Sequence, residues 1–181
     1  MSTLKVGTIQ STTGNTGLTI ANDGTVLPKA CAFQMTPTVV QAIPNQSDTQ
    51  FVFGASAIDT HSIVDLSNNR VVITSATAGL YYLSFVYRLE NVVPFRQSAF
   101  IKKNGNIIAV FMSTDYSQTT IPDSSNKVDT IVNLANSDIL TFHVWQGHGA
   151  SQNTSDDSFD NSTALGFGQS NRAEGFRIGT L

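Results

Sequence analysis

The feature that most constrains the fold is a strict two-residue alternation along residues 80–88. The even-numbered positions mix polar and apolar side chains, whereas the odd-numbered positions are all apolar. Successive side chains of a β-strand point to opposite faces, so a period of two indicates a half-buried strand. No long segment shows the 3.6-residue apolar period of a helix. The apolar face carries Tyr81, Leu83, Phe85 and Tyr87.

Further strand-like runs follow one another at short spacing. The clearest hairpin joins residues 98–103 to 106–111, because Asn104-Gly105 is the dipeptide that type I′ turns prefer. Many short antiparallel strands without helices predict an all-β antiparallel sandwich or barrel. We also expect residues 130–134 to pair with Ile139–Gln146 across the turn 135–138. The other predicted strands are residues 51–53, 70–74 and 176–181.

Residues 1–29 differ from the rest of the chain. They contain no aromatic residue, and their only charged residues are Lys5, Asp23 and Lys29. Asn22-Asp23-Gly24 between two β-prone runs predicts a hairpin. The segment has too few apolar residues for a core of its own, so we predict an N-terminal anchoring arm over 1–29 and a globular head over 30–181. Strand addition or hairpin packing by the arm would use Leu4, Val6, Ile9, Leu18, Ile20 and Val26.

The composition excludes several classes of function. Charged residues make up 13% of the chain, about half the usual share, and the formal net charge is −3. Lys102-Lys103 is the only pair of adjacent basic residues, so the chain lacks the basic footprint of a nucleic-acid-binding protein. A hydrophobic share of 40% argues against disorder. We therefore expect a folded domain whose surface is rich in hydroxyl and amide groups.

The cysteine content and the lack of long apolar segments limit the possible redox chemistry and location of the protein. Cys31 is the only cysteine, which excludes an intrachain disulfide and a thiolate metal cage, and we interpret it as a buried small hydrophobe. Residues 1–10 lack the apolar stretch of a signal peptide, and no run approaches the ~18 apolar residues of a membrane span. The sequence thus predicts a protein that is made in a reducing cytosol and does not insert into a membrane.

The head resembles a known family. Asn69–Ile73 followed by Ala78–Phe85 is similar to the signature of complement-type globular heads, which belong to the tumour-necrosis-factor-like jelly rolls. The Asn104-Gly105 hairpin and residues 175–178 match further along the chain, and Ser137 stands where the family usually has glycine. The resemblance implies a jelly roll of about eight to ten strands that forms a homotrimer around an apolar axis.

The same resemblance implies that one face of the strand at residues 80–88 meets neighbouring copies. The even-numbered set would supply the trimer interface while the odd-numbered set fills the core, or the reverse. The candidates for interface or core are Leu80, Tyr82, Val86 and Trp145.

The arm carries a second resemblance. Residues 2–6, 8–20 and 23–26 are similar to the opening of virion proteins from tailed phages of marine bacteria, where they precede a fibre or a knob. This implies a non-enzymatic phage virion structural protein that is assembled in the host cytoplasm, a surface knob serving as capsid decoration (cement) or short fibre. The arm would dock it on a major capsid or tail component. The alternatives are a receptor-binding tail-fibre tip that recognises a host surface glycan or protein, and a soluble ligand-binding head.

The sequence contains no recognisable catalytic or cofactor motif. Neither Gly-x-Ser-x-Gly nor a phosphate-binding Gly-x-x-x-x-Gly-Lys occurs, and the acids are scattered, so we predict no enzymatic activity and no cofactor. His143 and His148 match no standard metal spacing, and residues 156–160 lack the spacing of an EF-hand loop, so we predict no metal site.

A long polar stretch, residues 147–163, predicts an excursion from the sandwich. Loops longer than about 12–15 residues are usually functional or disordered, so this stretch is a candidate for recognition. The exposed recognition candidates, including one aromatic residue outside the stretch, are Tyr116, His148, Asp156, Asp157, Phe159 and Asp160.

Overall fold

The computed structural model describes residues 8–10, 16–20, 26–27, 30–92, 96–114, 121–154 and 171–179. The chain divides into two compact units, Met1–Cys31 and Ala32–Leu181. Within the described residues the regular structure is β-strand, apart from the 3₁₀ helix η1 at Leu66–Asn68. The all-β prediction is confirmed.

The N-terminal unit contains a small antiparallel sheet of order β1-β2-β3. Its strands are Thr8–Gln10, Thr16–Ile20 and Val26–Leu27. Ile20 is paired with Val26, as the hairpin prediction requires. Of the predicted anchoring residues, Leu4 and Val6 lie outside the described residues, whereas Ile9, Leu18, Ile20 and Val26 lie in these strands. Their anchoring role stays a prediction.

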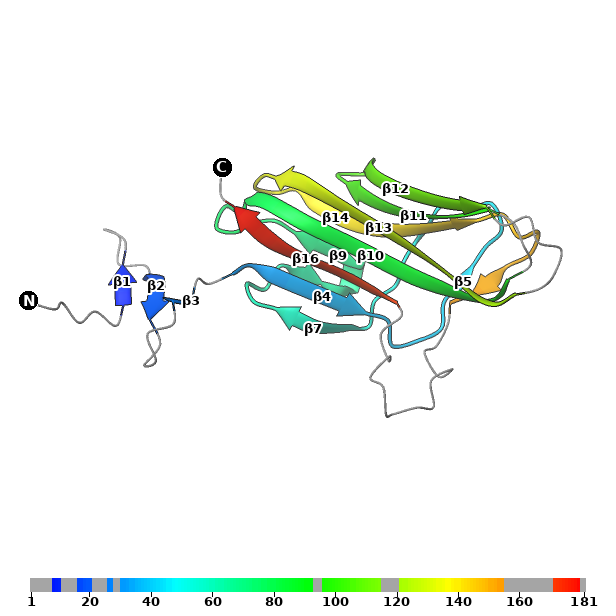
Figure 1. The fold of residues 1–181 in the computed structure, drawn as a ribbon, viewed down its shortest axis with the longest axis horizontal. Helices are drawn as coiled ribbons and strands as arrows, with labels where there is room; N and C mark the ends of the chain where they lie inside the picture. The colour runs from blue at the N-terminus through cyan, green and yellow to red at the C-terminus, as the bar shows by residue number, and fades with distance from the viewer. Residues whose placement is uncertain are drawn as a thin grey trace, which may run out of the picture. The chain divides into compact units, whose positions relative to one another are not determined.

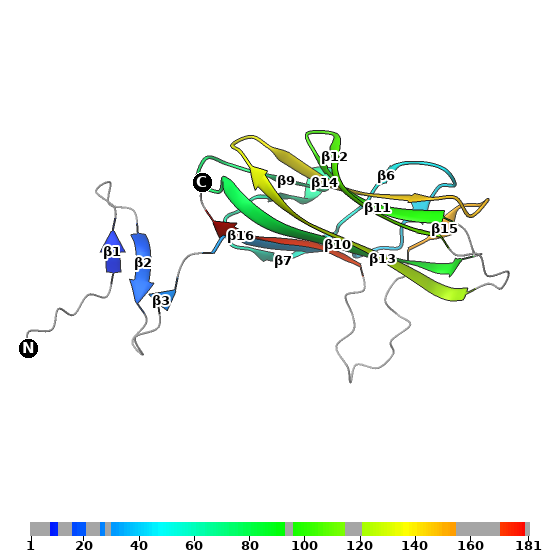
Figure 2. The ribbon, with the colours of Figure 1, turned by 45° about the horizontal axis from the view of Figure 1, so that its top comes forward.

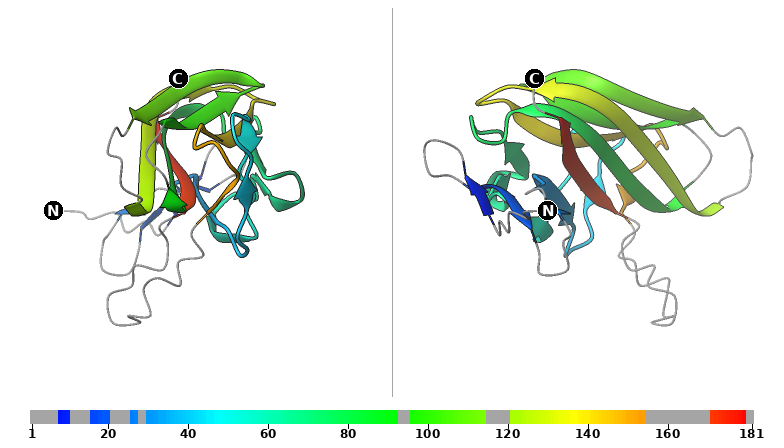
Figure 3. Two further views of the ribbon diagram at one scale, coloured as in Figure 1. Left: turned by 90° about the vertical axis from the view of Figure 1, so that its right-hand side faces the viewer. Right: turned by 60° about the vertical axis from the view of Figure 1, so that its left-hand side comes forward.

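One sheet of the globular unit, here called sheet I, has the order β13-β10-β16-β4-β7 in the described part of the chain (Figure 1). Each neighbouring pair is antiparallel. β16 lies beside β10, red against green in Figure 3, which brings the end of the chain next to its middle. The five strands, in that order, are Ile121–Leu134, Gly79–Val92, Arg172–Gly179, Ala32–Thr36 and Ala55–Asp59.

The second sheet, called sheet II, has the order β12-β11-β14-β9-β8, and β6 also pairs with β14. Figure 2 shows the two sheets as two layers. The strands, in that order and with β6 last, are Asn106–Thr114, Arg96–Lys103, Ile139–Gln146, Arg70–Val72, Val64–Asp65 and Thr49–Gln50. A further ladder pairs β15 (Gln152–Asn153) with β5 (Ala42–Ile43).

The core between the sheets is built on aromatic rings. The Phe85 ring centroid lies 5.4 Å from that of Phe51 and 5.5 Å from that of Phe142, while the Phe53 and Phe142 centroids are 5.9 Å apart. Aromatic contacts at these separations add stability beyond the burial of their area. The odd-numbered positions of β10 point into this core, and Tyr81, Leu83, Phe85 and Tyr87 are fully buried.

Two turns show why their residues were informative. The β11–β12 hairpin turns at Asn104 and Gly105, with φ of 52° and 80°, which confirms the predicted Asn-Gly hairpin. Ser137, which replaces the family's usual glycine, also has a left-handed φ of 70°. The turn geometry is therefore kept at Ser137 by a residue that adopts it less readily than glycine.

The structure corrects two strand predictions. Residues 51–53 alternate in burial but are not part of a β-ladder. The backbone N–H of Phe51 donates to the carbonyl of Phe142 over 2.8 Å. Residues 130–134 do not pair with Ile139–Gln146. The first segment pairs with β10 in sheet I, whereas the second pairs with β11 and β9 in sheet II, so the turn 135–138 crosses from one layer to the other.

The strand count and the polar excursion also differ from expectation. Together the five-stranded and six-stranded sheets contain more strands than the predicted eight to ten. The excess comes from two-residue strands such as β6 and β8. The first part of the excursion is ordered: β15 lies in it, and Thr154 is fully buried and bridges to Leu89. Residues 155–163 lie outside the described residues.

Candidate interaction surfaces

The outward face of sheet I exposes large apolar side chains in a row across three strands. The register places Ile131 of β13 and Phe176 of β16 on either side of Tyr82 of β10. Ile131 is 62% exposed and Phe176 47% exposed, and the Tyr82 and Phe176 ring centroids lie 5.3 Å apart. We call Ile131, Tyr82 and Phe176 the apolar row. Such a contiguous exposed patch is typical of a protein–protein contact surface.

Other residues extend this apolar region along and across the sheet. Leu80 is half-buried two positions before Tyr82, and Ile178, 46% exposed, lies two positions after Phe176, where the β16–β10 register shifts. Ile58 is 45% exposed on β7, the last strand in the order of sheet I. The outward face of sheet I is therefore apolar at more than one strand.

Charged residues form a band next to the apolar row. The register places Asp129 and Glu174 on either side of Ser84, and Lys127 and Arg172 on either side of Val86. Lys127 Nζ lies 3.1 Å from Asp129 Oδ2, and Arg172 Nε lies 3.2 Å from Glu174 Oε2. We call Lys127, Asp129, Arg172 and Glu174 the charged band.

Local bonds keep Lys127 and Asp129 ionised. Burial raises the pKa of Asp129, but hydrogen bonds from Ser84, Lys127 and Tyr82 outweigh it and bring this pKa below its ordinary value. The hydrogen bond to Asp129 raises the pKa of Lys127. Both charges therefore persist at neutral pH.

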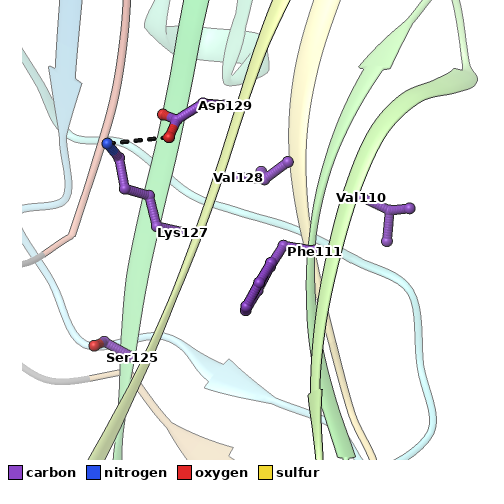
Figure 4. A pocket seen from close by; sticks show the side chains of 6 residues that line it. All are labelled: Val110, Phe111, Ser125, Lys127, Val128 and Asp129. Carbon is purple, nitrogen blue, oxygen red and sulfur yellow. Dashed lines mark ion pairs between the residues drawn. The ribbon is translucent and has the colours of Figure 1, made fainter.

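A groove of about 590 Å³ lies beside β12 and β13, which stand at the ends of the described strand orders of sheets II and I. Figure 4 shows the Phe111 ring pointing from β12 toward β13, and Val110 also lines this space. Phe111 is 47% exposed and Val128 is buried. Lys127 and Asp129 of the charged band also line it. The edge groove thus joins the outward face of sheet I to the open edge of the sandwich.

β12 itself is apolar on both faces. It has a neighbouring strand on one side only in the described order, so its other edge leaves backbone groups without a ladder. Four of its apolar side chains are between 47% and 55% exposed: Ile107, Val110, Phe111 and Met112.

The outward face of sheet II is organised by local polar bonds. His143 Nδ1 lies 2.7 Å from Asp48 Oδ1, and its Nε2 lies 3.1 Å from Thr141 Oγ1. Lys102 forms a second ion pair with Asp48. Burial of the ring and the charge of Lys102 outweigh the attraction of Asp48 and hold the pKa of His143 below its ordinary value.

The four residues predicted as interface or core do not share one surface. Leu80, Tyr82 and Val86 alternate with the buried residues of β10 and lie on the outward face of sheet I. Trp145 alternates with the buried Phe142 and Val144 of β14, so it lies on the outward face of sheet II. All four are half-buried, and the core is filled by the odd-numbered set.

The predicted recognition residues fall mostly outside the described part of the chain, namely Tyr116, Asp156, Asp157, Phe159 and Asp160. His148 is described and is half-buried; its backbone N–H donates to Gln146 Oε1 over 2.7 Å. Among the residues that the structure describes, no three histidine, cysteine or acidic side chains are grouped to hold a metal ion. The same residues include no helix that could cross a membrane.

Sequence reasoning missed the residues that make the surfaces most apolar. Phe176 and Ile131 were not assigned to an outward face, and the β12 residues were treated only as a hairpin arm. A usable signal was present in both places: residues 107–112 are apolar at every position, and Phe176 and Ile178 alternate with Gly175 and Arg177.

Solved structures with a similar arrangement decide the fold. Murine APRIL aligns with a TM-score of 0.59 and 12% identity over 82% of this chain and 99% of that chain. The globular domain of zebrafish complement 1qA aligns with a TM-score of 0.53 and 12% identity over 83% and 99% of the two chains. Eiger TNF from S. frugiperda aligns with a TM-score of 0.63 and 10% identity over 84% and 94%. The globular unit is a TNF- and complement-like jelly roll. No family model matches the sequence, and no curated protein matches it either.

Proposed function

We propose that the chain is a non-enzymatic surface knob that self-associates as a homotrimer and is displayed on a phage particle through its N-terminal arm. The observation that carries the self-association is the presence, on one globular unit, of two unlike surfaces that expose large apolar side chains. These are the apolar row of sheet I and the edge groove beside Phe111.

Two unlike surfaces favour a ring over a two-fold dimer. A two-fold contact uses the same patch on both partners, whereas a contact between different patches is head-to-tail and closes into a ring when the rotation allows. Docking the edge groove of one copy on the apolar row of the next would cover both surfaces in every copy. The likeness of the fold to TNF and complement domains supports a ring of three.

The virion role rests on the arm. Its sequence resembles the opening of tailed-phage virion proteins, and it forms a compact unit separate from the globular one. In the described residues, β1 and β3 end the order of its small sheet, so each offers a backbone edge for strand addition to a capsid or tail protein. The motif-free sequence supports a structural role without catalysis.

Mass measurement in solution tests the trimer. Light scattering should give three times the chain mass of 19.4 kDa. A single-chain mass in dilute buffer would contradict self-association.

Antibody labelling of intact purified particles tests the location. Labelling over the whole head supports capsid decoration, and labelling of the tail alone supports the receptor-binding alternative, with a host surface glycan or protein as partner. Detection of the protein only in the free fraction overturns both virion roles and favours a soluble ligand-binding head.

Deletion of residues 2–27 tests the anchoring role of the arm. The truncated chain should still form a folded trimer but should no longer join particles. Incorporation at normal copy number would show that the arm is not the anchor, and loss of trimers would make the arm a trimerisation element.

A further inference from the structure

The turn Asn104-Gly105 fastens the β11–β12 hairpin to the turn 135–138, which crosses between the sheets. Asn104 Nδ2 donates to Asp138 Oδ1 over 2.7 Å, and Asn104 Oδ1 accepts from the backbone N–H of Ile139 over 2.8 Å. The backbone N–H of Asn104 also donates to the carbonyl of Ile139, 2.9 Å away. Both polar atoms of one side-chain amide are therefore used to hold the hairpin tip in place.

Asp138 requires a hydrogen-bond donor at the position of Asn104 Nδ2. Its side chain is 10% exposed, and its Oδ2 accepts from the backbone N–H of Ala135 over 2.8 Å. Burial raises the pKa of Asp138, but the hydrogen bonds from Ala135 and Asn104 and the charge of Lys103 outweigh it and bring this pKa below its ordinary value. The carboxylate is thus ionised at neutral pH, and a second carboxylate facing it across the turn would repel it.

An asparagine followed by glycine can lose its side-chain amide without an enzyme. The backbone nitrogen of Gly105 attacks Cγ of Asn104 and forms a C–N bond, the bond from Cγ to Nδ2 breaks, and Nδ2 leaves as ammonia with the proton of the backbone nitrogen. Water then opens the five-membered imide and leaves either an aspartate or an isoaspartate, whose backbone is one carbon longer. Glycine favours the attack because no Cβ hinders its nitrogen. Water is the only co-reactant.

The folded globular unit hinders this attack. The side chain of Asn104 must rotate to bring Cγ to the nitrogen of Gly105, but its hydrogen bonds with Asp138 and Ile139 hold it in place. The backbone of the turn is also fixed, because the flanking residues Lys103 and Asn106 are paired in the β11–β12 ladder. The reaction therefore requires the turn to open, as it does when the chain unfolds.

We infer that Asn104 is a deamidation site that is blocked in the folded globular unit and reactive in the unfolded chain, and that the reaction prevents the turn from forming again. An aspartate product replaces the donor Nδ2 with an anionic oxygen facing Asp138, and an isoaspartate product lengthens a turn of two residues. Such modification of the unfolded chain makes unfolding irreversible. The inference goes beyond the proposed assembly and does not depend on it, because all of these bonds lie within one copy.

Incubation of the whole chain at mildly alkaline pH, in buffer and in urea, tests whether folding blocks the reaction. Peptide mapping by mass spectrometry should find deamidation at Asn104 at least about 30-fold slower in buffer than in urea, because the paired turn opens rarely. A rate in buffer within a few fold of the rate in urea overturns the inference.

The matched control for irreversibility is Asn104→Gly. Glycine adopts the same positive φ of 52° but carries no amide to lose. After long incubation in urea followed by dilution, the wild type should regain less native fluorescence from Trp145, its single tryptophan, in step with deamidation. Asn104→Gly should regain its own native signal after short and long incubation alike. Equal losses in the two proteins, or full recovery of deamidated wild type, overturn the inference.

Asn104→Asp imitates one product from the start. It should unfold at a lower urea concentration than the wild type, because it faces Asp138 with a like charge and without a donor. A midpoint equal to or above that of the wild type overturns the claim that the product cannot restore the turn. A wild type that is a single chain in solution would contradict the proposed trimer and leave this inference standing, since each readout concerns one chain.

Discussion

The two outward faces of the sandwich use their polar groups in different ways. On sheet II, Asp48 bonds with both His143 and Lys102, and Asp65 accepts from Arg70 Nε at 2.8 Å. Gln50 Nε2 donates to the carbonyl of Asn68 over 2.9 Å. These bonds hold the connections between strands against the sheet, so the polar groups of this face serve the fold.

Sheet I shows the opposite pattern. Its most exposed side chains are apolar, as at Ile131 and Phe176, and its ion pairs link neighbours on the same strand, as at Lys127 and Asp129. Such pairs do not connect a loop to the sheet. The comparison teaches that sheet II is complete within one chain around β14, β9 and β8, whereas sheet I, the edge groove and the exposed strand β12 have the chemistry of a surface that meets a partner.

The largest expected effect on stability comes from a substitution in the core between the two sheets. Phe142 is fully buried and its ring contacts those of Phe33, Phe53 and Phe85. Phe142→Ala should lower the free energy of unfolding by about 3–5 kcal/mol, because it leaves a cavity among rings that cannot collapse. Urea unfolding measures this loss. A variant that unfolds like the wild type would contradict the packing described for the core.

The next prediction distinguishes the outward face of sheet I from that of sheet II by their effect on self-association. Phe176→Glu places a charge in the apolar row at a position that is already 47% exposed, so the fold should persist. Association should weaken by at least about 2 kcal/mol, or about 30-fold, as expected for an aromatic anchor. Trp145→Ala on sheet II is the control and should leave the solution mass unchanged. Light scattering over a dilution series measures both, and dissociation in the Trp145 variant alone would reverse the assignment of the faces.

Strand alternation and turn residues made the sandwich and the central hairpin predictable. Tyr81 to Tyr87 marked β10 as a strand with one apolar face, and Asn104-Gly105 marked the β11–β12 turn, because both signals are local. The sequence left open whether that apolar face fills the core or meets a neighbouring copy. The partner of each strand was harder: residues 130–134 and Ile139–Gln146 are close in sequence and alternate alike, yet they belong to different sheets. The register across β10 that gathers Ile131, Tyr82 and Phe176 depends on segments far apart in the chain, and no local pattern encodes it.

A smaller effect is the pH dependence of stability that His143 of sheet II contributes. The folded state holds the pKa of His143 below the ordinary value of 6.5, so the unfolded chain takes up the proton first. Stability is therefore present above this value and is lost as pH falls through it. The free energy of unfolding should decline between pH 7.5 and 5.5, and His143→Gln should reduce the slope. The slopes come from urea titrations of both proteins, and identical slopes would remove His143 from this dependence.

The smallest expected effect lies in the turn that carries the chain from sheet I to sheet II. Ser137 is exposed, has a φ of 70°, and uses its backbone N–H to donate to the carbonyl of Ile73 over 2.8 Å. Glycine keeps that bond and removes the strain of a left-handed side-chain-bearing residue, although it also gives the unfolded chain more freedom. Ser137→Gly should therefore stabilise the fold by about 0.5–1 kcal/mol.

The matched variant is Asn104→Gly in the β11–β12 turn, where φ is 52°. Unlike Ser137, Asn104 uses its side chain twice: its Nδ2 donates to Asp138 Oδ1 and its Oδ1 accepts from the backbone of Ile139. Loss of these bonds should outweigh the relief of strain and destabilise the fold by about 1 kcal/mol. Both turns lie away from the apolar row, so association should be unchanged in both variants. Opposite signs in urea unfolding would show that the side-chain bonds, and not the positive φ alone, decide which turn residue each site favours.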